Sequence, residues 1–271
     1  MHPTLEIFGR TLGVYGIFAV LGLAAAVALV TLLTRKKGIE FEDVLMLMIS
    51  VGIGMFLGGH ILYGITQIKG IIGLFSSISE YTFLEFVIAL FGTYLGGMLY
   101  YGGFIGAVIG LLIHCHFSKY VKLKDVIDEF AAAVPLFHGF ARIGCFFAGC
   151  CYGIEWSWGF IVYDNTINPA INGVVRFPVQ LFESACNFLI FLALFILYKK
   201  GKFKYRLLFV YMLIYPVCRF ILDFFRGDGA GGYIFGMTTS QFISILVFAA
   251  GIAGLIISHF CRGRRILRSD I

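Results

Sequence analysis

The sequence predicts an all-α integral membrane protein, a seven-transmembrane helical bundle with a re-entrant or interfacial segment near residues 83–100. Of the 271 residues, 60% are hydrophobic and 13% are charged, which gives more apolar surface than one soluble core can bury. Many apolar runs reach the roughly 20 residues that span a bilayer, and none shows the ten-residue alternation of an outer-membrane β-barrel. We expect residues 1–271 to form a single transmembrane domain.

The apolar runs place the helices in order along the chain. The N-terminal residues lack the basic region and cleavage site of a signal peptide, so the first run is expected to remain as a span. The third run is too long for one untilted span and is interrupted by glycines, so its first half is expected to be re-entrant or surface-lying, with a span following Tyr100. The predicted spans are residues 12–33, 44–66, 84–117, 126–150, 179–198, 207–225 and 238–260.

Basic residues between the spans predict the topology. Lysines and arginines cluster at residues 35–37, 119–124, 199–206 and 262–268. With seven spans all four clusters fall on one side, which the positive-inside rule makes cytoplasmic, with the N-terminus outside and the C-terminus inside. The net charge of +6 lies mostly in these short loops, so it indicates lipid head groups as partners and no nucleic acid.

The stretch from residue 135 to residue 153, PLFHGFARIGCFFAGCCYG, places polar side chains within an apolar segment. His138, Arg142 and Cys145 are spaced i, i+4, i+7, so they share one face if the segment is helical. An arginine at membrane depth is costly unless it is paired or faces a wet cavity, and Arg142 is therefore a candidate functional residue.

Two later spans each carry one polar face. The fifth contains Gln180, Glu183 and Asn187, and the sixth contains Arg219, Asp223 and Arg226. One interpretation is that these are structural contacts between helices. Once Arg142 and Arg176 are added, however, the arginines near the outer face outnumber the carboxylates. Because a guanidinium fork fits phosphate oxygens, the expected surplus favours a phosphate-bearing ligand such as a phospholipid head group.

The seven cysteines form no disulfide framework. A zinc site made by His138 and three cysteines, Cys145, Cys150 and Cys151, is one alternative, but no C-x-x-C pair is present and adjacent cysteines do not easily occupy two corners of a tetrahedron. A disulfide from Cys145 to Cys150 or Cys151 is another. We expect buried inert thiols, with no metal and no cofactor.

Three further side chains in or near the spans are candidates for contact with a ligand. His60 ends the GGH of the second span and is interpreted first as an interhelical hydrogen-bonding group and second as a base. Tyr15 and Tyr101 lie near glycines and can hydrogen-bond a head group, although aromatic residues in such a chain usually belong to the core or to an interfacial belt.

Six fragments occur in order along the chain: VYG at 14–16, GGH at 58–60, GGMLYYGGFIG at 96–106, ARIGCFFAGCCYG at 141–153, RFPVQLFES at 176–184 and CRFILDFFRGD at 218–228. Together they resemble the prolipoprotein diacylglyceryl transferases of bacterial membranes. Such enzymes move the diacylglyceryl group of phosphatidylglycerol onto the lipobox cysteine of a prolipoprotein, at the outer face of the cytoplasmic membrane, and release glycerol phosphate. The resemblance implies phosphatidylglycerol or a related anionic glycerophospholipid as donor and a prolipoprotein signal peptide as partner.

The resemblance also implies roles for individual residues. Arg142 and Arg219 would handle the phosphate, Asp223 would replace the usual glutamate, and Gly153 keeps the family glycine. In four places the chain departs from the family pattern, with Tyr101 for a histidine, Cys145 for an asparagine, Cys150 for a glutamate and His60 for an arginine. The candidate catalytic residues are Arg142, Arg219, Asp223, His138, Tyr101 and Cys145, and the candidate binding residues are Tyr15, His60, Cys150, Gly153, Arg176, Gln180, Glu183 and Arg226.

These departures keep several functions open. A tyrosine is a poor base at neutral pH, so His138 or His60 is hypothesised to deprotonate the thiol. A divergent paralogue could use the same lipid for another acceptor, or pass an acyl group through a thioester on Cys145 or Cys150. A non-catalytic lipid-binding protein is the third class.

Overall fold

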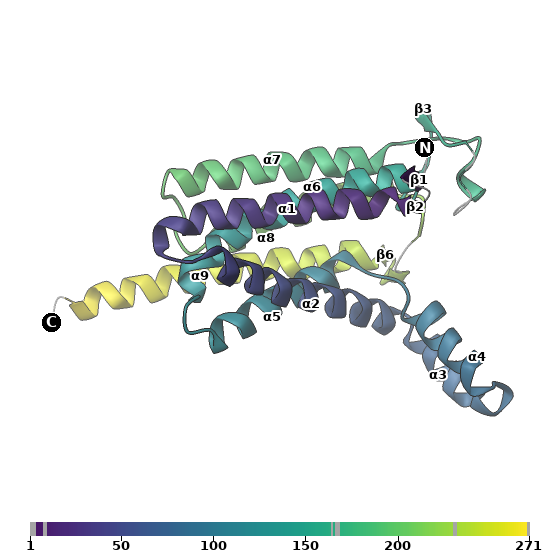
Figure 1. Ribbon diagram of the computed structural model, residues 1–271, viewed down its shortest axis with the longest axis horizontal. Helices are drawn as coiled ribbons and strands as arrows, with labels where there is room; N and C mark the ends of the chain where they lie inside the picture. Colours follow the sequence, from purple (N-terminus) through teal and green to yellow (C-terminus); the bar gives the residue numbers. More distant parts are fainter. Residues whose placement is uncertain (1–3, 8–9, 164, 166–168, 230–231, 270–271) are drawn as a thin grey trace. The chain divides into compact units, whose positions relative to one another are not determined.

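The computed structural model describes residues 4–7, 10–163, 165, 169–229 and 232–269, and these residues are mostly helical (Figure 1). Among them, six helices are long and apolar enough to cross a membrane. They are α1 (Val14–Thr34, continued by η1, Arg35–Lys37), α2 (Phe41–Thr66), α5 (Tyr100–Phe117), α6 (Leu123–Ala148), α7 (Val179–Lys199) and α9 (Thr239–Ser269). The chain forms two compact units: Met1–Lys37 with Lys124–Ala230 and Ile234–Ile271, and Gly38–Leu123 with Gly231–Tyr233.

The seventh predicted span, residues 207–225, corresponds to α8 (Leu207–Asp223). With 17 residues it is shorter than each of the six long apolar helices. The helix ends at Asp223 because the next residues turn back, and Arg226 forms a β-bridge with Gly153. The structure therefore supports a multi-pass helical membrane protein, and the count of seven spans remains a prediction.

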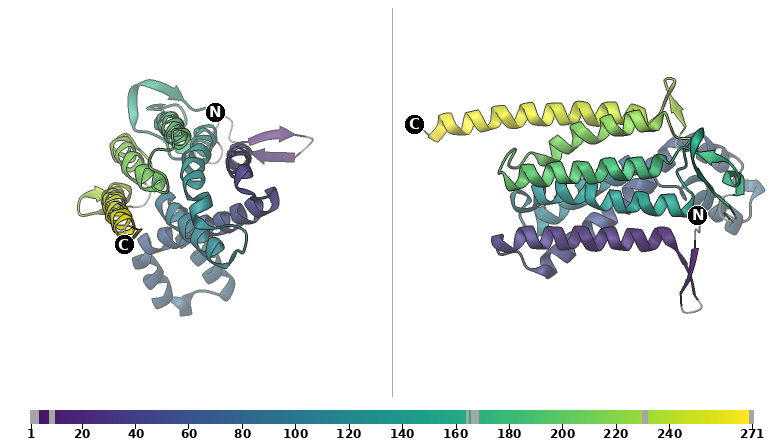
Figure 2. Two further views of the ribbon diagram at one scale, coloured as in Figure 1. Left: turned by 90° about the vertical axis from the view of Figure 1, so that its left-hand side faces the viewer. Right: turned by 90° about the horizontal axis from the view of Figure 1, so that it is seen from above.

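In the first unit α1, α6, α7, α8 and α9 run along one direction (Figures 1 and 2). α7 packs on α8, and α8 packs on α9. The contact between α6 and α7 includes a hydrogen bond from Ser184 Oγ to the carbonyl oxygen of Gly139, 2.8 Å long. α6 also contacts α1, where a Cβ on Gly22 would lie 2.9 Å from Cβ of Phe140. α6 is thus held between two neighbours, which buries its polar residues.

Short strands that the sequence analysis did not predict cap this unit. β1 (Thr4–Ile7) pairs with β2 (Arg10–Gly13), β3 (Glu155–Ile161) pairs with β4 (Val175–Arg176), and β5 (Tyr233–Ile234) pairs with β6 (Met237–Thr238). A 3-10 turn, η4 (Pro169–Ile171), lies between β3 and β4. β1, β2, β3 and β6 gather at one end of the unit (Figure 1). Since β2 continues to Gly13, the first helix begins two residues later than the predicted span.

In the second unit the long third run is broken, as predicted. α3 (Ile68–Ser76), η2 (Ile78–Glu80), α4 (Phe83–Ile88) and the π-helix η3 (Ala89–Tyr94) precede a non-helical stretch, and α5 begins at Tyr100. Whether residues 83–94 enter the membrane stays a prediction. α2 and α5 approach so closely that a Cβ on Gly106 would lie 2.0 Å from the carbonyl oxygen of Gly54. Glycine is required at this crossing, as in many contacts between membrane helices.

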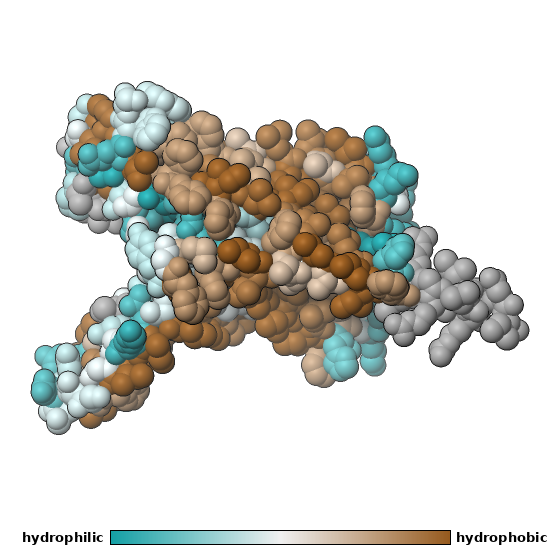
Figure 3. All heavy atoms as spheres, turned by 180° about the vertical axis from the view of Figure 1, so that it is seen from behind, coloured by the Kyte–Doolittle hydropathy of each residue, from teal (hydrophilic) through white to brown (hydrophobic). Residues whose placement is uncertain are grey.

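The outer surface of the long helices is hydrophobic (Figure 3). Leu32 is 69% exposed, Leu189 66% and Ile257 61%. Large apolar side chains exposed over whole helices are expected where lipid is the solvent. The arginines at 262–268, which the topology prediction uses, have side chains that lie outside the described part of the structure.

Candidate functional site

A buried carboxylate, Glu183 of α7, lies at the centre of the polar residues in the first unit. Its Oε2 atom is 3.0 Å from Nε of Arg142 on α6 and 3.0 Å from Nη1 of Arg219 on α8. The side chain of Glu183 is 2% exposed. The sequence analysis named Glu183 as a candidate binding residue, and the structure makes it the common partner of the two arginines.

Arg142 contacts Glu183 through one edge of its guanidinium group. Nε points to Glu183 and, at 3.2 Å, to Nε2 of His138. Its terminal nitrogens have one hydrogen-bond partner among the described residues. This partner is Sγ of Cys145, which lies 3.8 Å from Nη1 and is a weak acceptor. The two-pronged end of Arg142 is therefore not occupied by a carboxylate of the described chain. That end is the part of an arginine that grips phosphate oxygens in pairs.

Arg219 is held more completely. Besides Glu183, its Nη2 contacts Oδ1 of Asp223 at 2.9 Å and donates to Oγ of Ser240 at 3.1 Å. Asp223 in turn accepts a hydrogen bond from Oγ1 of Thr238. α7, α8 and the start of α9 thus fix this guanidinium group in one orientation.

Tyr215, which the sequence analysis missed, belongs to the same cluster. Its hydroxyl donates to Oε1 of Glu183 at 3.0 Å, and its ring meets the ring of His138 with centroids 5.3 Å apart. The spacing Tyr215, Arg219, Asp223, four residues each, puts all three on one face of α8 and was a usable signal. We call Arg142, Glu183, Tyr215, Arg219 and Asp223 the arginine cluster.

His138 lies beside the arginine cluster and is 4% exposed. Its Nε2 accepts from Nε of Arg142, so that ring nitrogen carries a lone pair and the proton is on Nδ1 in the neutral ring. The lone pair that a general base would use is already directed at Arg142. In this geometry His138 positions the arginine.

The predicted surplus of arginines is wrong for the described residues. Arg142 and Arg219 share Glu183 and Asp223, Arg226 is paired with Asp228, and Arg176 lies 4.0 Å from Glu155. The prediction set the four arginines against Glu183, Asp223 and Asp228 and did not include Glu155. The two buried arginines nevertheless differ in how they are paired. Arg142 contacts its carboxylate through Nε, whereas Arg219 contacts carboxylates through its terminal nitrogens.

A second group of predicted residues, from β4 and the start of α7, contacts the loop that follows α6. Nε2 of Gln180 donates to the carbonyl oxygen of Cys150 at 2.9 Å, and Nη1 of Arg176 donates to that of Gly153 at 3.2 Å. A Cβ on Gly153 would lie 2.1 Å from the carbonyl oxygen of Phe177, so no larger residue fits without a backbone shift. These contacts fix the backbone of the loop that follows α6.

Tyr15 and the cysteines complete the picture of the first unit. Tyr15 of α1 is packed against α6, where a Cβ on Gly144 would lie 3.2 Å from its Cα. The sulfur atoms of Cys145, Cys150 and Cys151 all lie within 4.8 Å of one another. The sequence analysis considered the three thiols together but did not predict this proximity.

His60 and Tyr101 belong to the second unit. Nδ1 of His60 lies 2.7 Å from the carbonyl oxygen of Leu95. Because a carbonyl oxygen only accepts, Nδ1 carries the proton and the lone pair is on Nε2. Tyr101 is 3% exposed and meets the ring of Tyr100 at 5.7 Å.

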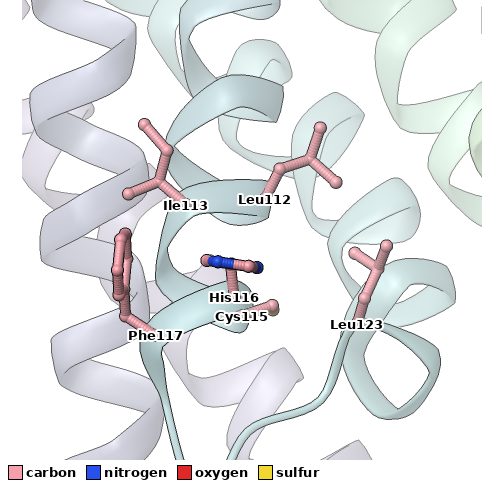
Figure 4. Close-up of a pocket in the computed structure, with 6 residues that line it drawn as sticks. All are labelled: Leu112, Ile113, Cys115, His116, Phe117 and Leu123. Atoms are coloured by element: carbon pink, nitrogen blue, oxygen red, sulfur yellow. The ribbon is translucent and has the colours of Figure 1, made fainter.

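An open apolar pocket also lies in the second unit (Figure 4). It is lined by Leu112, Ile113, Cys115, His116, Phe117 and Leu123. It contains no arginine and none of the predicted site residues, so it gives no support for phosphate binding.

Comparison with known proteins covers nearly the whole chain. The family model for prolipoprotein diacylglyceryl transferase matches residues 3–257. A phosphatidylglycerol–prolipoprotein diacylglyceryl transferase of Clostridium tetani is 36% identical over 96% of this chain and 99% of its own length. Relatives with that description in Clostridium perfringens and Campylobacter curvus are 34% and 32% identical, each over 91% of this chain and over 91% and 89% of their own lengths. The chain therefore belongs to the prolipoprotein diacylglyceryl transferase family.

Proposed function

We propose that this protein transfers the diacylglyceryl group of phosphatidylglycerol to the lipobox cysteine of a prolipoprotein. Membership of the family supports the reaction type, and the names of the relatives include both substrates. The chain matches them over at least 91% of its length in the three cases above.

The observation that carries the proposal is the orientation of Arg142. Glu183 holds its Nε edge at 3.0 Å, while the terminal nitrogens face Cys145 and no carboxylate of the described residues. We assign that free fork to the phosphate of the donor lipid. Arg219, fixed by Glu183 and Asp223, supplies the second positive charge of the site.

In the proposed reaction the thiolate sulfur of the acceptor attacks the glyceryl carbon next to the phosphate. A C–S bond forms, the C–O bond to the phosphate breaks, and its electron pair stays on the phosphate oxygen of the departing glycerol phosphate. Negative charge grows on that oxygen in the transition state, so a guanidinium group already in place lowers the barrier. Glu183 and Tyr215 act by positioning the two arginines.

The base that deprotonates the thiol is hypothesised to be His138 or His60, and each is tested by its own alanine variant. Nε2 of His138 accepts from Arg142 in this structure. Tyr15 of the first unit is assigned to a hydrogen bond with the donor lipid.

We further propose a single domain of seven spans in the bacterial cytoplasmic membrane, with α8 as the seventh. α8 is short, but it packs between α7 and α9, and its outward side chains such as Ile221, 53% exposed, are apolar. Seven spans put the N-terminus outside and the basic loops inside. The loop after α6 then faces the outer leaflet.

Complementation tests the proposal. A bacterial strain depleted of its own lipoprotein-modifying transferase would be supplied with this chain, and growth and lipoprotein modification would be followed. We expect rescue by the native chain and none by Arg142→Ala. Membrane-inserted protein that does not restore lipoprotein modification would contradict the proposal and leave another acceptor or a binding function.

A further inference from the structure

Cys145, Cys150 and Cys151 form a cluster, called here the three-thiol cluster, that the proposed reaction does not use. Its geometry begins with the end of α6. The amide of Gly149 donates to the carbonyl oxygen of Phe146 at 3.3 Å, and the amide of Cys150 donates to that of Cys145 at 3.2 Å. Gly149 has φ +73°. This pair of bonds is a Schellman motif, which brings the side chains of its first and last residues, here Cys145 and Cys150, into contact.

The backbone at Cys151 brings in the third thiol. Cys151 has φ +54°, in the left-handed region that residues other than glycine rarely adopt. The chain therefore turns again directly after the Schellman motif. Adjacent cysteines on an extended chain would point apart, but here all three sulfur atoms lie within 4.8 Å of one another. The sequence-based objection to a metal, that Cys150 and Cys151 are neighbours, does not hold for this backbone.

The spacing of the sulfur atoms matches a bound metal ion. Bonds of about 2.3 Å from a metal to three thiolates in one plane would hold the sulfur atoms about 4 Å apart. No two of the three sulfur atoms are farther apart than 4.8 Å, so no pair has to close by more than an ångström to reach this spacing. The three cysteines are free thiols in this structure.

A positively charged group lies beside the cluster. Nη1 of Arg142 is 3.8 Å from Sγ of Cys145. Cys145 is buried and Cys150 is exposed, so the cluster has an inner ligand and an approach from solvent.

We propose that the three-thiol cluster binds one soft d10 metal ion, of the class of Zn²⁺, Cd²⁺ and Cu⁺. Thiolate sulfur selects such ions over hard cations. For a divalent ion, three thiol protons pass to solvent as three metal–sulfur bonds form, which leaves a complex of net charge −1 beside Arg142. No described histidine or carboxylate joins the three sulfur atoms, so the ion is either three-coordinate, which suits Cu⁺, or keeps a fourth position for an external ligand, which suits the tetrahedral preference of Zn²⁺.

The test is a titration of the purified, reduced protein in detergent with Cd²⁺, followed by the ultraviolet charge-transfer band of cadmium thiolates. We expect saturation at one ion per chain. Cys145→Ser, Cys150→Ser and Cys151→Ser should each weaken binding at least tenfold. The matched control is the pair Cys186→Ser and Cys218→Ser, two cysteines outside the cluster, which should bind as the native chain does. Repetition with Zn²⁺ and with Cu⁺ separates the two coordination modes.

Thermal unfolding of every variant shows whether it remains folded. Loss of the band in a cluster variant that unfolds at the native temperature supports the proposal. Absence of a one-to-one band in the native chain would overturn it, as would undiminished binding by any folded cluster variant or loss of the band in the control. A disulfide within the cluster that persists under reductant and excludes Cd²⁺ would overturn it as well.

Discussion

Removing the charge of Glu183 perturbs the arginine cluster at its centre. Glu183→Gln keeps the size of the side chain but leaves Arg142 and Arg219 with Asp223 as the remaining carboxylate of the cluster. The glutamine amide has one oxygen that accepts and one NH2 group that donates. The NH2 group would face a guanidinium group, which also only donates. The cluster would then hold one unbalanced positive charge.

The magnitude follows from burial. The three side chains are 2%, 7% and 5% exposed for Glu183, Arg142 and Arg219. Breaking a buried ion pair by removing one partner costs about 3 to 5 kcal/mol. For a chain of this size, at about 2 to 4 °C per kcal/mol, the expected fall in unfolding temperature is about 6 to 20 °C.

The assay is thermal unfolding of the purified protein in one detergent, with Glu155→Gln as the matched control. Glu155 pairs with Arg176 at 4.0 Å but its side chain is 74% exposed, so its loss should cost less than about 1 kcal/mol. Equal unfolding temperatures for Glu183→Gln and the native chain would refute the buried ionic cluster.

Three further predictions concern turnover and packing. Arg142→Ala and Arg219→Ala should each lower turnover at least about a hundredfold, the usual loss for a transition-state donor. Lysine at either position should recover little of the activity because the two-pronged guanidinium end is lost. Full activity in Arg219→Lys, measured as release of glycerol phosphate, would contradict the bidentate role of Arg219. Gly153→Ala places a methyl group 2.1 Å from a carbonyl oxygen and should destabilise the protein by about 1 to 3 kcal/mol in thermal unfolding, whereas Gly52→Ala, with nothing within 4 Å, should not destabilise it. His138→Ala and His60→Ala test the two candidate bases: loss of the base should lower turnover about a hundredfold, and undiminished lipid turnover in either variant would remove that histidine.

The helices could be predicted from the sequence because lipid imposes a simple rule on them. A run of about 20 apolar residues must be helical at membrane depth, and α7, observed at Val179–Lys199, differs by one residue from the predicted 179–198. The short strands could not be predicted this way. β3 and β4 lie outside the long apolar helices, where pairing depends on turns and on partners distant in sequence.

The site was predicted as a set of residues but not as a network. Helical spacing showed that Arg219 and Asp223 share a face, and they are paired at 2.9 Å. It could not show that Glu183 lies between two arginines from different helices, because that depends on how α6, α7 and α8 pack. The predicted charge surplus failed for the same reason, since Glu155 comes from strand β3, whose course a helical pattern does not describe.

The central claim is that the arginine cluster holds the phosphate of phosphatidylglycerol while a thiol takes its diacylglyceryl group. The most direct measurement uses the purified native chain, phosphatidylglycerol labelled in the head group, and a peptide with a lipobox cysteine. The account predicts labelled glycerol phosphate and thioether-linked peptide in equal amounts, with neither product from Arg142→Ala. Phosphatidylglycerol that binds but stays intact, or fatty acid attached to an enzyme cysteine and released by hydroxylamine, would contradict it.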